Sequence, residues 1–204
     1  MKKLASLGFI HNLQTGFGYI RSAAISVGCC VLVIGLVVAM PTSANDIELA
    51  ISNDMIDLRF RAEYERDFSG TFAFLHADFK DIESDQVSYG FETRGQIENV
   101  IVKLGSRLFF IDAGRADGFG AALGVGAEAF IVEKVSATGQ FYYSPQIITG
   151  GDLESTLDAE VRVNYQLIEN GALFIGYRVY EIDAEKGGSV DIYDDPYLGI
   201  KFTF

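Results

Sequence analysis

The chain has 204 residues, of which 49% are apolar, 13% aromatic and 22% charged, and its formal net charge is −12. A charge of this sign argues against nucleic acid as a partner, because nucleic-acid binding uses a basic surface, and the length admits one domain. Both cysteines, Cys29 and Cys30, lie in an apolar N-terminal stretch. The rest of the chain therefore has no disulfide, thiolate nucleophile or cysteine metal site.

The N-terminal region predicts export. Residues 23–40 are uncharged and largely apolar, follow Lys2, Lys3 and Arg21, and precede the small residues that end at Ala44. This order predicts a signal peptide over residues 1–44, cleaved after Ala44. A retained membrane anchor is the alternative, because the apolar stretch could just span a bilayer. Cleavage leaves residues 45–204 with 13 basic and 28 acidic residues, a net charge of −15.

The rest of the chain alternates between apolar and polar side chains. In residues 55–65, Ile56, Leu58, Phe60, Ala62 and Tyr64 alternate with charged residues, and the same pattern recurs at 87–94 and 160–167. A period of two indicates strands, because successive strand residues point to opposite faces. We predict ten strands, at about residues 46–52, 55–65, 71–79, 87–94, 99–110, 119–131, 136–144, 160–167, 172–182 and 196–204. If 46–52 is a loose lead-in, the count falls toward eight.

Two features refine this prediction. Asn53-Asp54 is suited to a hairpin that pairs Ile51 with Ile56, which puts both on the apolar face. In residues 119–131, the polar face is supplied by Glu128 and by glycines at 120, 124 and 126. Small residues on that face leave room inside a closed wall.

The connections alternate in length. Short ones are predicted at 67–70, 95–98, 133–134 and 168–171, and longer ones at 80–86, 112–118, 145–153 and 183–195. Short turns at one end and longer loops at the other are typical of outer-membrane β-barrels. We therefore expect both ends of residues 45–204 in the periplasm and the longer, acidic loops outside the cell.

The last eight residues alternate and end on a phenylalanine. Leu198, Ile200, Phe202 and Phe204 share one face of the predicted strand. Gly199, Phe202 and Phe204 resemble the C-terminal signal that the barrel-assembly machinery reads in bacterial outer-membrane proteins. The alternative is an ordinary amphipathic strand that completes a soluble β-sandwich.

The C-terminal third also resembles the YfaZ family of outer-membrane proteins. The matching features are Tyr142-Tyr143-Ser144-Pro145, Gly176-Tyr177-Arg178, and Pro196-Tyr197 followed by Gly199 and Phe204. The likeness is good from about Gly139 to the end and fades toward residue 71. It implies a small closed barrel and supplies no catalytic residues, because the family has no established biochemical role.

Together these observations predict a closed antiparallel transmembrane β-barrel. Closure is required because a bilayer offers backbone groups no water. The apolar face would contact lipid, and with tryptophan absent the interfacial aromatic belt would use tyrosine and phenylalanine. Candidates for it are Tyr64, Phe79, Tyr89, Phe110, Phe119, Tyr143, Tyr165, Phe202 and Phe204.

The opposite face gathers charges of both signs, which we predict line the lumen. The acids are Asp57, Glu63, Asp78, Glu92, Glu128, Asp158 and Glu160, and the bases are Arg59, Arg61, Arg94, Lys103, Arg107, Arg162, Arg178 and Lys201. Buried charges must be paired or hydrated, and eight to ten strands make a narrow barrel that long side chains can cross. We expect a lumen filled with salt bridges. A narrow water-filled channel and a ligand pocket are the alternatives.

No catalytic, metal or cofactor site is predicted. His76 and Asp78 lie two residues apart and would share the lumen face, but no nucleophile motif accompanies them. Acidic residues in the loops could bridge through divalent cations to lipopolysaccharide, although no spacing matches a calcium loop. We expect a monomer that contacts outer-membrane lipid and lipopolysaccharide. A membrane-embedded enzyme and a secreted lipocalin-like binder remain as other classes.

Overall fold

The computed structural model describes residues 45–204 except 81, 115 and 186–187. The predicted signal peptide lies outside the described residues. The elements are β1 (Asn45–Ile51), β2 (Met55–Glu65), β3 (Phe68–Phe79), β4 (Ile82–Ile97), β5 (Val100–Asp112), β6 (Asp117–Val132), β7 (Val135–Ser144), the 3₁₀ turn η1 (Gln146–Ile148), β8 (Thr149–Gly151), β9 (Leu153–Ile168), β10 (Gly171–Ala184) and β11 (Gly188–Thr203).

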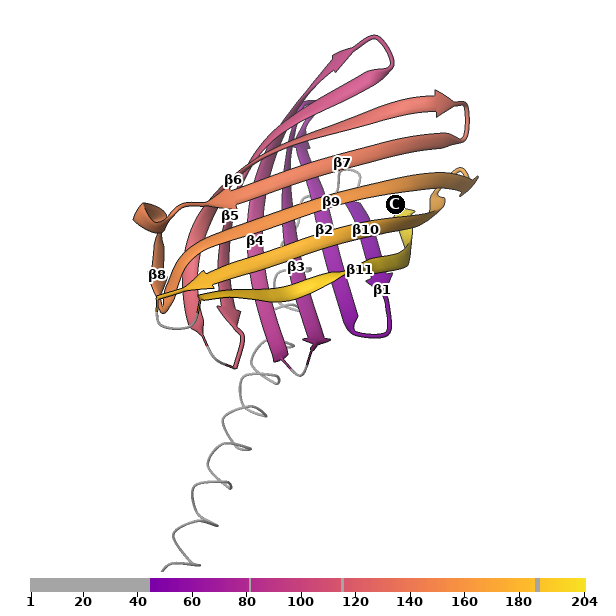
Figure 1. Cartoon of the computed structure of the whole chain (residues 1–204). Helices are drawn as coiled ribbons and strands as arrows, with labels where there is room; N and C mark the ends of the chain where they lie inside the picture. Colours follow the sequence, from indigo (N-terminus) through magenta and orange to yellow (C-terminus); the bar gives the residue numbers. More distant parts are fainter. Residues whose placement is uncertain (1–44, 81, 115, 186–187) are drawn as a thin grey trace, which may run out of the picture. The chain divides into compact units, whose positions relative to one another are not determined.

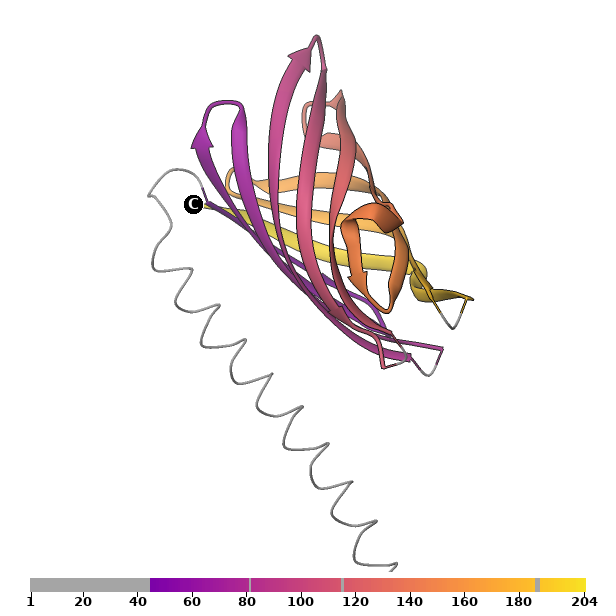
Figure 2. The ribbon, with the colours of Figure 1, turned by 90° about the vertical axis from the view of Figure 1, so that its left-hand side faces the viewer.

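Ten of the described strands close into an antiparallel barrel (Figure 1). Each long strand pairs with its neighbour in the chain, and β1 pairs with β11 from Asp46 opposite Thr203 to Ile51 opposite Leu198. The eleventh strand, β8, pairs only with Gly118–Gly120 of β6, beyond the point where β7 ends. Figures 1 and 2 show η1 and β8 as a short segment at the edge of the barrel wall beside β6. The all-β barrel is confirmed, with ten strands rather than eight.

The two ends of the barrel differ. The turn end, as we name it, carries the links 66–67, 98–99, 133–134 and 169–170 together with Asn45 and Phe204. The loop end carries the links 52–54, 80–81, 113–116, 145–152 and 185–187. In the first hairpin Ile51 is paired with Ile56, as predicted.

Two of the four predicted long loops, 80–86 and 183–195, are wrong, because the strands continue. β4 begins at Ile82 and β11 at Gly188, and β10 pairs with β11 as far as Ala184 opposite Gly188. The predicted loops 112–118 and 145–153 correspond to the links 113–116 and 145–152. An antiparallel strand tolerates a carboxylate where its face meets water, so these acidic segments belong to the strands rather than to loops.

The alternation sorts most strands as predicted. Val125 on β6 is exposed on the outer surface, as are Leu198 and Phe202 on β11 and Phe204 just after it, while the Lys201 side chain faces inward. On β3 the prediction was inverted. Leu75, Ala77 and Phe79 are buried in the lumen, so His76 and Asp78 lie on the outer face and Phe79 does not contribute to the aromatic belt.

At the loop end the lumen is packed with apolar side chains. Phe79, Tyr180, Ile182, Ile192 and Tyr193 are buried there, and the rings of Phe79 and Tyr193 lie 5.9 Å apart. Ile192 and Tyr193 are adjacent in sequence and both point inward because a register shift at Tyr180/Glu181 interrupts the alternation. We call this group the apolar seal. It occupies the loop end of the lumen.

Candidate functional site: the charged lumen

Arg178 on β10 lies at the centre of the charged lumen. Its Nε donates to Asp158 Oδ1 on β9 at 2.8 Å, and its Nη1 donates to Asp57 Oδ2 on β2 at 2.7 Å. Arg107 on β5 donates to the same Asp158 carboxylate. Asp158 therefore joins its neighbour β10 to β5 on another part of the wall. All of these carboxylates are buried.

Glu160 on β9 is a second centre. Its Oε2 accepts hydrogen bonds from Arg59 Nη2 at 2.7 Å and from Gln140 Nε2 at 2.8 Å, and its Oε1 accepts one from the Tyr197 hydroxyl. Arg59 also donates to Asp57, so the two centres share one network. Between β2 and β9 lie three strands on one side of the ring and five on the other, and this contact therefore crosses the lumen.

Further ion pairs continue the network to the turn end. Arg162 Nη1 is 2.7 Å from Glu48 Oε2, Lys201 Nζ is 2.8 Å from Asp46 Oδ2, and Arg94 Nη1 is 2.8 Å from Glu63 Oε1. Two cations have only a longer ion pair. Arg61 Nη2 lies 3.3 Å from Glu92 Oε2, and Lys103 Nζ lies 3.8 Å from Glu128 Oε2.

The structure thus places every charged residue of the predicted lumen set in an ion pair, with one exception. Asp78 is the exception, because it lies on the outer face of β3. Asp46 and Glu48 belong to the network and were missed, since residues 46–52 had been weighed as a loose lead-in. Their alternation with Ile47 and Leu49 is the signal that could have found them. When Asp78 is removed from the predicted set and Asp46 and Glu48 are added, the described ion-paired lumen residues comprise eight acids and eight bases.

Glycines make room for the large rings inside the wall. A Cβ at Gly124 would overlap the Tyr142 ring, and a Cβ at Gly176 would overlap Tyr197. The ring of Tyr142 also packs against the Arg107 guanidinium at 4.0 Å, and its hydroxyl donates to Glu92 Oε1 at 2.8 Å. The space left by the glycines is therefore filled by aromatic side chains that anchor the charges.

Two cavities in the described part of the lumen have room for water. The central chamber has a volume of about 40 Å³, and the buried Asp57 Oδ1, Gln86 Oε1 and Glu92 Oε2, which have no hydrogen-bond partner, belong to residues that line it. This volume has room for a few waters, which would satisfy these acceptors. The turn-end cleft has a volume of about 220 Å³. Arg61 lines both cavities and lies between them.

His76 is not part of the lumen. Its Nδ1 lies 2.8 Å from Asp85 Oδ1 on the neighbouring strand β4, and both side chains are exposed on the outer surface. The predicted lumen position for His76 is wrong, because the face of β3 was inverted. Within the described part of the chain, no group of three or more His, Cys, Asp or Glu could hold a metal ion.

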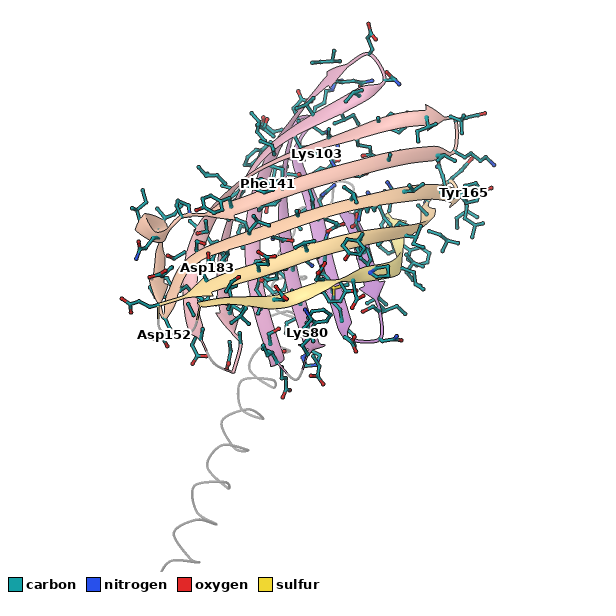
Figure 3. The ribbon with its side chains drawn as sticks, viewed as in Figure 1. Lys80, Lys103, Phe141, Asp152, Tyr165 and Asp183 are labelled. Atoms are coloured by element: carbon teal, nitrogen blue, oxygen red, sulfur yellow. The ribbon has the colours of Figure 1, made fainter. Side chains whose placement is uncertain are left out.

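The loop end carries exposed polar contacts. Figure 3 labels Lys80, Asp152 and Asp183 there and Tyr165 at the turn end. Lys80 Nζ lies 2.8 Å from Asp191 Oδ2, and this hydrogen bond raises the pKa of Lys80. Among residues 45–204 as described, no helix has the length and apolarity to cross a membrane.

The fold and the lumen define a class of protein. A ring without free edges, an apolar outer surface and charges on the inner face are the features of a β-barrel that spans a membrane. The family comparison then places the chain: the model described as "YfaZ precursor" matches residues 23–204, and the chain belongs to the YfaZ family. It is an exported outer-membrane β-barrel protein.

A curated relative agrees with this assignment. Outer membrane protein YfaZ of Escherichia coli strain K12 is 27% identical over 89 residues, which are 43% of this chain and 49% of that protein. The match therefore spans about half the length of the relative.

Solved structures resemble the chain distantly. A KdgM porin is 8% identical with a TM-score of 0.44, covering 79% of this chain and 99% of that one. The outer membrane channel DcaP of Acinetobacter baumannii is 14% identical with a TM-score of 0.42, covering 77% and 54%. At these scores neither likeness carries an inference about this chain.

Proposed function

We propose that this protein is a structural barrel of the outer membrane that does not conduct ions. The observation that supports this most is the pair of barriers in series along the lumen. The first is the network around Arg178, Asp158 and Glu160, which includes contacts that cross the lumen. The second is the apolar seal at the loop end. A hydrated ion would have to break the first and then enter an apolar layer.

The proposal includes an orientation and partners. The turn end faces the periplasm, as the short turns of outer-membrane barrels do, and the loop end faces outside. The outer apolar surface contacts lipid, and the acidic loop end lies against lipopolysaccharide. Gly199, Phe202 and Phe204 form the signal for the barrel-assembly machinery. The barrel acts as a monomer without cofactor or catalytic activity.

Single-channel recording of the refolded mature protein tests the proposal. We expect no conductance steps, whereas a porin in the same bilayer shows that the recording detects pores. Steps of stable size would overturn the proposal and favour the narrow channel. A variant with Tyr180→Ala, Ile182→Ala and Tyr193→Ala opens the apolar seal alone. If the charged network is a barrier by itself, this variant still conducts nothing.

A further inference from the structure

The turn-end cleft is large enough for a solute. Its volume of about 220 Å³ is far above the ~10–15 Å³ that holds one water. It is lined from several strands, and its wall includes the cations Arg61, Lys103, Lys134, Arg162 and Lys201 and the carboxylates Glu128, Glu133 and Glu169. The free hydrogen-bonding capacity of this wall decides which ligand fits.

Lys103 has the most free capacity of the ion-paired lumen cations. Every other one has a carboxylate within 3.3 Å, whereas the nearest carboxylate to Lys103 Nζ is Glu128 at 3.8 Å. That distance is too long for a hydrogen bond. The Lys103 side chain is only 14% exposed. A buried ammonium that donates to so few protein groups is costly unless water or a ligand accepts from it.

Arg61 is the next most weakly held of the ion-paired lumen cations. Its ion pair with Glu92 is 3.3 Å, and its Nε lies 3.5 Å from Thr71 Oγ1. Its partner Glu92 also accepts from the Tyr142 hydroxyl, and Glu128, the carboxylate nearest to Lys103, accepts from Ser136 Oγ at 2.8 Å. Lys103 and Arg61 therefore keep donor capacity that these two carboxylates do not fill.

We propose that the turn-end cleft binds a small oxyanion, a carboxylate or phosphate group, between Lys103 and Arg61. Such a group presents several acceptor oxygens and a negative charge. Its hydrogen bonds with the two cations are charge-assisted and therefore stronger than neutral ones. The cleft opens at the turn end and the apolar seal closes the loop end, so the ligand enters and leaves on the same side. The site is a receptor-like pocket within a closed barrel, and it does not depend on whether the barrel conducts.

Calorimetric titration of the refolded mature protein in a neutral detergent tests the site. The probes are inorganic phosphate and glutarate, with chloride at matched ionic strength as the reference. We expect saturable binding of a probe, weakened at least tenfold by Lys103→Gln and largely retained by Lys103→Arg. Lys80→Gln is the matched control, because it removes a cation at the loop end. It should leave the affinity unchanged.

The outcomes separate clearly. Heat no greater than that of chloride, or equal affinity in Lys103→Gln, overturns the site. If Lys103→Gln fails to refold, Arg61→Gln gives the same comparison. A further titration with phosphatidylglycerol distinguishes the source of the oxyanion. Displacement of the bound probe assigns the site to a lipid headgroup, and its retention assigns the site to a soluble solute. Conductance is recorded separately, so the structural proposal can fail while this one holds.

Discussion

Arg178 holds Asp158 in a two-pronged contact, with Nε donating to Oδ1 at 2.8 Å and Nη2 donating to Oδ2 at 2.9 Å. The remaining Nη1 donates to Asp57, which lies three strands away across β11 and β1. All three side chains are at least 96% buried. One guanidinium therefore ties together two carboxylates that would otherwise repel each other in a closed space.

Replacing Arg178 by alanine should be strongly destabilising. Removing one partner of a buried ion pair leaves an uncompensated charge, which costs about 3–5 kcal/mol of unfolding free energy. Denaturant unfolding in detergent micelles measures the change. Lys80→Ala removes an exposed pair at the loop end and should leave the unfolding free energy unchanged. A loss in Arg178→Ala no larger than in this control would mean that hydration replaces the contact.

Val125 tests which surface of the wall meets lipid. Its side chain is exposed on the outer face of β6. Arginine there should cost about 2–4 kcal/mol if the position lies near the middle of the bilayer. The variant is compared with Val125→Leu, which keeps the surface apolar, by unfolding from lipid vesicles. Equal stability of the two variants would place Val125 away from the hydrocarbon.

The sequence predicted the faces of a strand well where one face was charged. On β2, Arg59 and Arg61 alternate with Leu58 and Phe60, so only one assignment puts the apolar residues in lipid. On β3 both faces are apolar, because Leu75 and Phe79 line the lumen while Phe72 and Phe74 lie on the other face. Periodicity could not tell them apart. The lumen face of β3 is apolar because Phe79 belongs to the apolar seal. That group comes together only when the ring closes, so one strand does not reveal it.

The charged site could be predicted as a set but not as pairs. Period two places Asp158, Glu160 and Arg162 of β9 on the inner face, and the structure has them there. Their partners come from β1, β2, β5 and β10. The strand order and the stagger of the closed barrel decide which side chains meet. The alternation within one strand predicts neither of them.

His76 tests the enzymatic alternative. It forms a close pair with Asp85, and the two could act as base and orienting carboxylate. Both face outward, and no nucleophile accompanies them among the contacts described. His76→Ala should therefore leave any lipid hydrolysis by the refolded protein unchanged, measured by release of fatty acid from labelled phospholipid. A selective loss of hydrolysis in this variant would revive the enzyme hypothesis.

Gly199 has a structural role apart from any signal. A Cβ at this position would overlap the Phe174 ring and the Leu49 carbonyl oxygen. Gly199→Ala should therefore lower the unfolding free energy by about 1–3 kcal/mol through overpacking. Phe174→Ala removes one of the two obstacles, so the cost of Gly199→Ala should be smaller in that background. A double-mutant cycle measures this coupling. Strict additivity would show that the ring does not occupy the space over Gly199.

Deleting Phe204 tests whether this residue is an assembly signal or a stabilising contact. Its side chain is 73% exposed at the turn end, so its removal loses little packing. If the assembly machinery reads it, deleting Phe204 should reduce the folded fraction in the outer membrane several-fold and leave the unfolding free energy of the refolded protein unchanged. Leu198→Ala is the matched control, because Leu198 lies on the same face of β11 and is also exposed. It should assemble normally. An equal assembly defect in both variants, or a parallel loss of stability on deletion, would make Phe204 an ordinary last residue.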